Sequence, residues 1–160
     1  MPFNETTDLE PGRPAHAVSQ AIDTLRNDGE LVDWLEGDAA DVILDGHGAG
    51  DIPSRALLVE DVVGGSTQSA AVERVRITLQ VTPLVSRSVY RVVSPRYLAA
   101  VRDRAIATLR RDGLGPGYRY LGALDALSLP EPETASDIDA VMEHMGRVQF
   151  AADVVRNTQP

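Results

Sequence analysis

The chain has 160 residues, of which 43% are hydrophobic and 24% charged, a length and composition typical of one globular domain. This excludes a disordered or collagen-like chain, and no apolar run of about 18 residues is present that would span a bilayer. The 24 acids outnumber the 15 bases and give a net charge of −9, which disfavours binding to nucleic-acid backbones through bulk charge.

The basic residues are all arginine, and the sequence contains neither lysine nor cysteine. The lack of cysteine excludes a disulfide scaffold, a thiolate metal site and a cysteine nucleophile. An excess of acids without lysine resembles the proteins of salt-loving archaea, where molar salt screens charges beyond about 3 Å. The codon usage of a GC-rich genome is the alternative explanation.

Residues 1–13 are polar and turn-forming, and they are predicted to form a loose arm ahead of one domain at 14–156, with 157–160 as a C-terminal tail. A helix is predicted from Pro14, because apolar residues recur at helical spacing on one face. These residues are Val18, Ala21, Ile22 and Leu25. A second helical stretch is predicted at 30–36, with Trp34 as a core anchor.

Three strands are predicted next, at 41–45, 56–63 and 72–83. The third has the clearest pattern, because its odd positions are apolar and its even positions polar, as in a half-buried strand. The apolar positions are Val75, Ile77, Leu79 and Val81. The glycine-rich segments 45–51 and 64–69 are predicted to be mobile loops. Residues 84–93 fit either a continued strand or a connecting loop.

A second main helix is predicted to about Arg111, with Ser94 as N-cap and Pro95 at its first position. Its apolar stripe consists of Leu98, Val101, Ala105 and Leu109. Strands are predicted from 118 to about 129 and from 146 to 155. This order predicts a single α+β domain, with a mainly antiparallel sheet of about five strands flanked by two main helices.

No enzyme signature is found in the sequence. His16, His47 and His144 are far apart and lack metal-binding spacing. The segment 45–51 lacks both the lysine of a P-loop and the acidic ladder of a calcium loop. We therefore expect no catalytic, cofactor-binding or metal site.

Several short patterns accompany this order of elements. Residues 42–46 read Val-Ile-Leu-Asp-Gly, the second main helix contains Tyr97-Leu98, and residues 147–154 follow the pattern R-V-x-F-x-x-x-V. Over about residues 14–156 the chain thereby resembles the tail terminator, or tail completion, proteins of long-tailed (siphovirus-like) viruses. The segments 84–93 and 131–144 are longer than in that layout. This leaves open a head completion protein or neck adaptor of the same virion.

The resemblance implies a non-enzymatic ring, usually six-fold, that caps the tail tube, ends tail growth and joins the tail to the neck and head. Its partners would be other copies of itself, the tail tube protein and a neck or head completion protein. DNA would pass through the lumen without specific binding, and no membrane or cofactor is implied. With the lysine-free acidic composition, it implies the virion of a haloarchaeal virus, after synthesis in the host cytoplasm. A small cellular enzyme or ligand-binding module is the alternative from another class.

Two sets of residues are predicted to serve such a ring. The first set would form oppositely charged pairs across a subunit contact. Its members are Arg87, Arg91, Arg102, Asp38 and Asp41. The second set would lie on lumen or docking loops, where carboxylates weakly repel DNA. Its members are Asp45, Asp51, Glu60 and Asp61.

Overall fold

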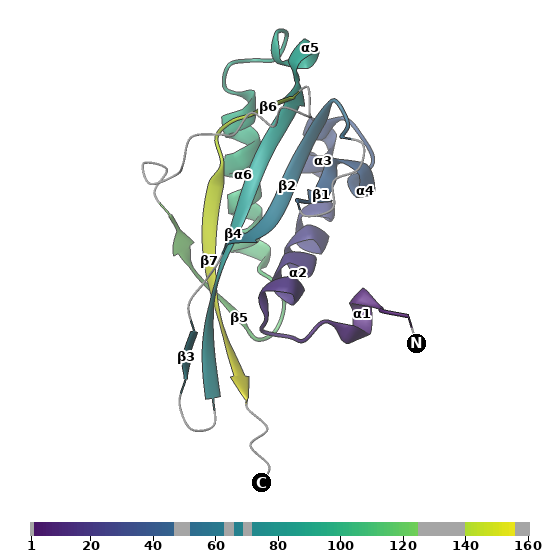
Figure 1. The fold of residues 1–160 in the computed structure, drawn as a ribbon. Helices are drawn as coiled ribbons and strands as arrows, with labels where there is room; N and C mark the ends of the chain where they lie inside the picture. Colours follow the sequence, from purple (N-terminus) through teal and green to yellow (C-terminus); the bar gives the residue numbers. More distant parts are fainter. Residues whose placement is uncertain (1, 47–51, 63–65, 69–71, 125–139, 156–160) are drawn as a thin grey trace.

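The centre of the molecule is one mixed, mostly antiparallel sheet packed against two main helices, α2 (Pro14–Arg26) and α6 (Tyr97–Asp112) (Figure 1). The computed structural model describes residues 2–46, 52–62, 66–68, 72–124 and 140–155. Within these residues the chain is a single α+β domain, which confirms the predicted fold class.

Five strands lie side by side in the order β1-β2-β4-β7-β5. Their bounds are β1 Ile43–Asp45, β2 Arg55–Val62, β4 Val72–Ser86, β7 Gly146–Val155 and β5 Tyr118–Ala123. Strand β1 is parallel to β2, whereas the other neighbours are antiparallel. Two short strands, β3 (Ser66–Gln68) and β6 (Ala140–Met142), also pair with β4.

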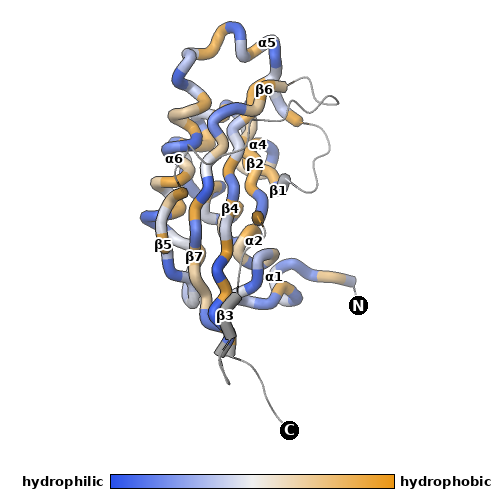
Figure 2. The backbone as a smooth tube through the Cα atoms, turned by 60° about the vertical axis from the view of Figure 1, so that its left-hand side comes forward, coloured by the Kyte–Doolittle hydropathy of each residue, from blue (hydrophilic) through white to orange (hydrophobic). Residues whose placement is uncertain are grey.

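Hydrophobic and hydrophilic residues alternate along β4 (Figure 2), so its two faces differ in polarity. The predicted odd positions are buried under α2 and α6, together with the predicted apolar stripes of these helices. On the opposite face the Gln80 amide donates to Glu60 and accepts from Arg147, so that a polar ladder crosses β2, β4 and β7. A small apolar cluster lies on that face around Ala56 and Leu84.

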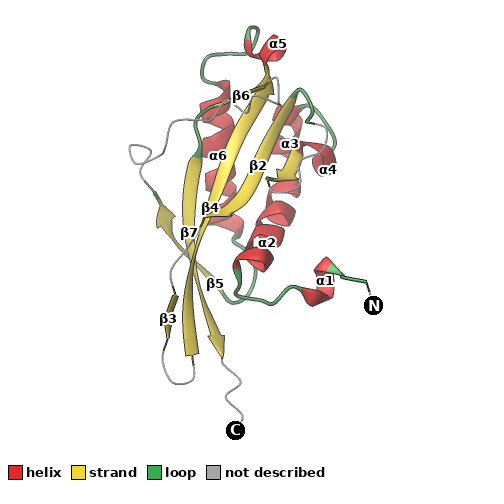
Figure 3. Cartoon of the chain, in the orientation of Figure 1, coloured by secondary structure: helices red, strands yellow, loops and turns green. Residues whose placement is uncertain are grey.

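The long central strand β4 extends further than the helices that pack on the sheet (Figure 3). A strand rises about 3.3 Å per residue, so the 15 residues of β4 span roughly 50 Å. The 16 residues of α6 span only about 24 Å, because a helix rises about 1.5 Å per residue. The β3–β4 hairpin and the end of β7 therefore extend beyond the helices at one end, and α5 (Arg87–Tyr90) caps the other.

Strands β6 and β7 pair with the same side of β4, and a β-bulge lies between the two pairings. Between its pairings with the two strands, β4 contributes two residues, 82 and 83, whereas the opposite strand contributes three, 143–145. Pro83 has no N–H to donate to a ladder, and bulges are where a sheet tolerates proline. The extra residue is accommodated by His144, whose φ is 61°.

Several boundaries differ from the prediction because short-range contacts alter the local backbone. The predicted strand at 41–45 begins only at Ile43, after one helical turn, α4 (Ala39–Val42). Helix α3 (Gly29–Leu35) buries Leu31 and Leu35, whereas Trp34 is half-buried at the edge of the core. Strand β5 ends at Ala123, and the remainder of the predicted strand to 129 lies outside the described residues.

The second half of the chain shows two further differences. The ambiguous segment 84–93 is divided between the end of β4 and α5. Helix α6 begins at Tyr97 rather than Pro95, and the Ser94 hydroxyl accepts from the N–H of Arg96 ahead of it. In the segment predicted to be mobile at 64–69, residues 66–68 form β3, because their backbone pairs with β4.

The end of the N-terminal arm contacts the sheet. The arm contains one helical turn, α1 (Glu5–Asp8), without buried residues. After it, the Gly12 N–H donates to the Tyr118 hydroxyl at 2.8 Å, and the Arg13 guanidinium donates to Glu73 at 3.0 Å. His16 stacks on Tyr118, with 2.6 Å between His16 Nδ1 and the same hydroxyl. These contacts fix where the chain enters α2.

Gly12→Ala is expected to lower the free energy of unfolding by about 2 kcal/mol. Gly12 has a φ of +84°, and an added Cβ would lie 2.5 Å from Cγ2 of Val154. The matched control is Gly29→Ala at the start of α3, where an added Cβ meets no atom within 4 Å and stability should stay equal or rise slightly. Urea unfolding of both variants tests this. Equal stabilities would contradict the close packing of Gly12 on β7.

Candidate subunit interface

Four of the five predicted contact residues lie toward one end of the molecule. Asp38 and Asp41 belong to the α4 turn, Arg87 begins α5 and Arg91 follows it, and all four are exposed. A cavity at this end is lined by both aspartates and by Val89 of α5. Arg87 and Arg91 are not among the residues that line it. Their contact with a neighbouring subunit stays a prediction.

Arg102 lies apart from the other four predicted contact residues. It is in α6 beside the start of β7, where an added Cβ on Gly146 would lie 2.9 Å from its Cγ. Its guanidinium pairs with the adjacent Asp103 at 2.9 Å. From the sequence alone, Arg102 could not be distinguished from Arg87 and Arg91 as a contact residue. The relative placement of α5 and the middle of α6 becomes known only from the fold.

Three of the four acids predicted on lumen or docking loops lie on strands, within the ranges 41–45 and 56–63 that the sequence also predicts as strands, so the loop placement is wrong for them. Asp45 ends β1, and β2 includes both Glu60 and Asp61, because its backbone pairs with β4 throughout. Successive strand residues point to opposite faces, so Glu60 joins the polar ladder while Asp61 faces the helix side. Asp51 lies outside the described residues.

Asp45 and Asp61 line a groove at the β1 edge, beside α1 and α2, that encloses about 370 Å³. Its apolar floor consists of Leu9, Ala15, Val18 and Ile22. Its acidic rim consists of Glu5, Asp23, Asp45 and Asp61, with Arg26 as the single base. We call this the acidic groove. Its acids lie far apart in the sequence, and Leu9 within the polar arm is the only local signal that could have indicated it.

Arg26 covers part of the β1 edge. Its Nε and Nη2 donate to the carbonyl of Ile43 at 3.2 and 2.8 Å, and Nη2 also donates to the carbonyl of Ala40 at 3.3 Å. An edge strand exposes backbone groups that invite pairing with another chain, and a charged side chain over the edge hinders this. The β1 edge is therefore suited to side-chain contacts rather than to the addition of a strand.

The opposite edge of the sheet is formed by β5. Among the described strands it pairs only with β7. Tyr118 and Tyr120 are half-buried and alternate with the exposed Arg119 and Leu121, which is 40% exposed; Leu124, just beyond the strand, is 37% exposed. We call Arg119, Leu121 and Leu124 the β5 edge. An open edge with exposed leucines is typical of an association surface.

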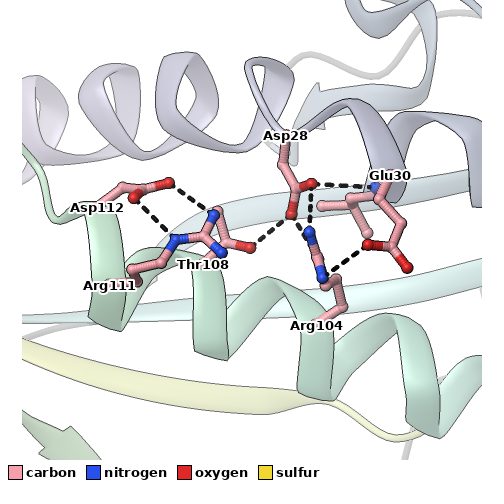
Figure 4. A network of polar contacts seen from close by, with 7 residues as sticks. Asp28, Glu30, Arg104, Thr108, Arg111 and Asp112 are labelled. Carbon is pink, nitrogen blue, oxygen red and sulfur yellow. Dashed lines mark hydrogen bonds and ion pairs between the residues drawn. The ribbon is translucent and has the colours of Figure 1, made fainter.

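A buried ion pair fixes the helix layer that supports both edges (Figure 4). The carboxylate of Asp28, which is 6% exposed, accepts two hydrogen bonds from the Arg104 guanidinium, at 2.8 and 2.9 Å. It also accepts from the Thr108 hydroxyl at 2.6 Å and from the N–H of Leu31 at 3.3 Å. Arg104 additionally pairs with Glu30 at 3.0 Å.

These contacts join the start of α3 to the middle of α6. The hydrogen bonds from Arg104, supported by those from Thr108 and Leu31, hold the pKa of the Asp28 carboxyl well below its ordinary value. Asp28 is also the N-cap of α3. The network therefore ties α3 to α6 and stabilises the helix layer.

No cluster of three metal-ligating side chains occurs in the part of the chain that the structure describes. Across the same residues, none of the helices has both the length and the apolar character needed to cross a membrane. No known family model matches the sequence. A search of curated proteins likewise finds no relative. The candidate site is therefore assigned from its geometry: two unlike edges of one sheet, one with an acidic groove and one with exposed leucines.

Proposed function

We propose that this chain is a structural, non-enzymatic protein of a long-tailed virus that forms a ring on the end of the tail tube. The ring ends tail growth and joins the tail to the neck and head. Its partners are other copies of the chain, the tail tube protein and a neck or head completion protein. The genome passes through the lumen without specific binding.

The observation that carries this proposal is the sheet with two unlike edges that reaches beyond its helices. Strand β5 presents exposed leucines at one edge, while the acidic groove lies at the other. A subunit with two different contact surfaces assembles head to tail, and such an assembly closes into a ring when the rotation fits. The projecting β3–β4 hairpin and α5 leave both ends of the sheet available to the tube and the neck (Figure 1).

The charge balance supports a channel that lets DNA slide. Cations that neutralise phosphates would hold the duplex, whereas an acidic lining repels it. With 24 acids and 15 bases, a neutral or acidic lining is the default expectation. The polar ladder of Glu60, Gln80 and Arg147 contains one acid and one base, so it presents no net positive charge.

Assembly and stability are expected to rise with salt concentration. Net charge far from zero causes self-repulsion within and between subunits, and salt screens it. Thermal melts and sedimentation from low to about 2 M KCl measure both, and both curves should increase with salt. Equal melting temperatures across the series would contradict salt adaptation and support codon usage as the origin of the missing lysines.

Immunogold labelling of purified virions tests the place of the protein. An antibody raised against the recombinant chain should label a single site, the junction of tail and neck. Label on the head side of the neck would instead support a head completion or neck adaptor protein. Label along the whole tail, or an absence of the protein from virions, would contradict the proposal.

A further inference from the structure

We infer that two copies of the chain associate through the two edges of the sheet, with the β5 edge of one copy seated in the acidic groove of the next. The inference rests on the self-association in the proposed function and names the surfaces that carry it. Both surfaces belong to this chain, so the occupant of the groove is a second copy. The two surfaces are complementary in polarity and charge.

The polarity of the two surfaces matches. Apolar side chains line the groove, of which Leu9 and Ala15 keep surface that a partner could cover, whereas Val18 and Ile22 are 4% and 8% exposed. The β5 edge offers Leu121 and Leu124, which are 40% and 37% exposed. Burying such side chains on association removes apolar surface from water, which is the main source of affinity in protein interfaces.

The charge of the two surfaces is opposite. The rim of the groove contains four acids and one arginine, and that arginine is hydrogen-bonded to main-chain carbonyls of Ile43 and Ala40. Among the described residues around β5, arginines outnumber acids, although the chain as a whole has a net charge of −9. Arg74 pairs with Asp153, which also interacts with Arg119, and Arg102 pairs with Asp103.

The fold places these arginines around the β5 edge. Arg119 is exposed on β5 itself. On α6, Arg102 lies against Gly146 at the start of β7, and the Leu124 N–H donates to the carbonyl of the next residue, Arg147. Arginines thus lie on β5 and beside the end of that strand.

The arrangement requires head-to-tail contact. The two surfaces lie at opposite edges of one sheet, since β1 and β5 end the strand order. A two-fold dimer would bring like surfaces together, with arginines facing arginines, whereas a head-to-tail array places each β5 edge against a groove. At molar salt the charges are screened, so the apolar contact supplies most of the affinity and the charges select the orientation.

Reciprocal charge reversal tests the inference. Arg119→Glu and Asp23→Arg each create a like-charge contact, and both positions are exposed. At the lowest salt at which the unmodified protein assembles, each single variant should weaken self-association about tenfold. The double variant should assemble as the unmodified protein does, and an equimolar mixture of the two single variants should co-assemble. The matched control is Arg96→Glu ahead of α6, an exposed position outside both surfaces and outside the predicted contact set, which makes the same charge change and should have no effect.

Sedimentation velocity and melting temperature are measured for every variant. Unchanged melting temperatures show that a loss of assembly is not a loss of fold. The inference fails if Arg96→Glu weakens assembly as much as Arg119→Glu, or if the double variant is no better than the singles. In either case assembly of the unmodified protein leaves the proposed ring standing. If the unmodified protein remains monomeric at every salt, both the inference and the proposed ring fail.

Discussion

Replacing Asp28 with alanine is expected to lower the free energy of unfolding by about 3 kcal/mol, because one member of a buried, hydrogen-bonded ion pair is removed. The loss has three parts in the structure. Arg104 loses its bidentate partner, the Thr108 hydroxyl loses its acceptor, and α3 loses its N-cap (Figure 4). The guanidinium of Arg104 remains half-buried without this compensation. Urea unfolding at pH 7 measures the effect.

Asp112→Ala is the matched control for this prediction. Asp112 also pairs with an arginine of α6, Arg111, at 3.0 Å, but both side chains are exposed. Exposed pairs contribute about 0–1 kcal/mol, so Asp112→Ala should change stability by far less than Asp28→Ala. Similar losses from both variants would contradict the role assigned to the buried pair.

The Asp28 network also predicts a pH dependence. The pKa of Asp28 is lowered in the folded protein, so its contribution is fully present above the unfolded pKa of about 3.9 and is lost as pH falls through the folded pKa. The stability difference between the unmodified protein and Asp28→Ala should therefore shrink below about pH 4. A difference that stays constant from pH 7 to pH 3 would contradict the lowered pKa.

Leu121→Asp is expected to weaken self-association about a hundredfold, since it both removes an apolar contact worth about 1.5–3 kcal/mol and places a carboxylate against an acidic rim. Leu121 is exposed on β5 and outside the core, so the monomer should keep its melting temperature. Molar salt should restore only part of the loss, because screening removes the repulsion but not the missing apolar contact.

Val92→Asp is the control for the exposed leucine. Val92 follows α5 and is 80% exposed, more than Leu121, yet it lies away from the β5 edge. Its substitution makes the same change in polarity and charge without touching either proposed surface. An equal loss of assembly from Val92→Asp would show that added negative charge, rather than the β5 edge, controls association.

Local patterns were sufficient to predict most of the architecture. The alternation along β4, the helical spacing in α2 and α6, and the bounds of β7 at 146–155 all agree with the structure. These elements bury one face each, so their polarity repeats at the period of the strand or helix. The bulge between β6 and β7 was not predicted, because the missing N–H of Pro83 matters only once the opposite strand is known.

The candidate site was predictable only in part. Asp38 and Asp41 were predicted as contact residues from their charge, and that contact stays a prediction. The acidic groove instead joins residues from the arm, α2, β1 and β2, which only the fold brings together. The Asp28–Arg104 pair spans 76 residues of sequence. A signal for Asp28 was present, since an aspartate ahead of Gly29–Leu35 is a common N-cap. No local sequence pattern of this kind identifies the arginine that pairs with a buried acid.

Electron microscopy of the purified protein in molar salt is the most direct test of the central claim, that this chain closes into a ring by head-to-tail contact. Class averages should show closed rings with a central channel, with about six subunits of 17.2 kDa. The maps should place β5 of each subunit against the α1–α2 side of its neighbour. Monomers at every concentration, or a two-fold dimer with β5 facing β5, would contradict the account.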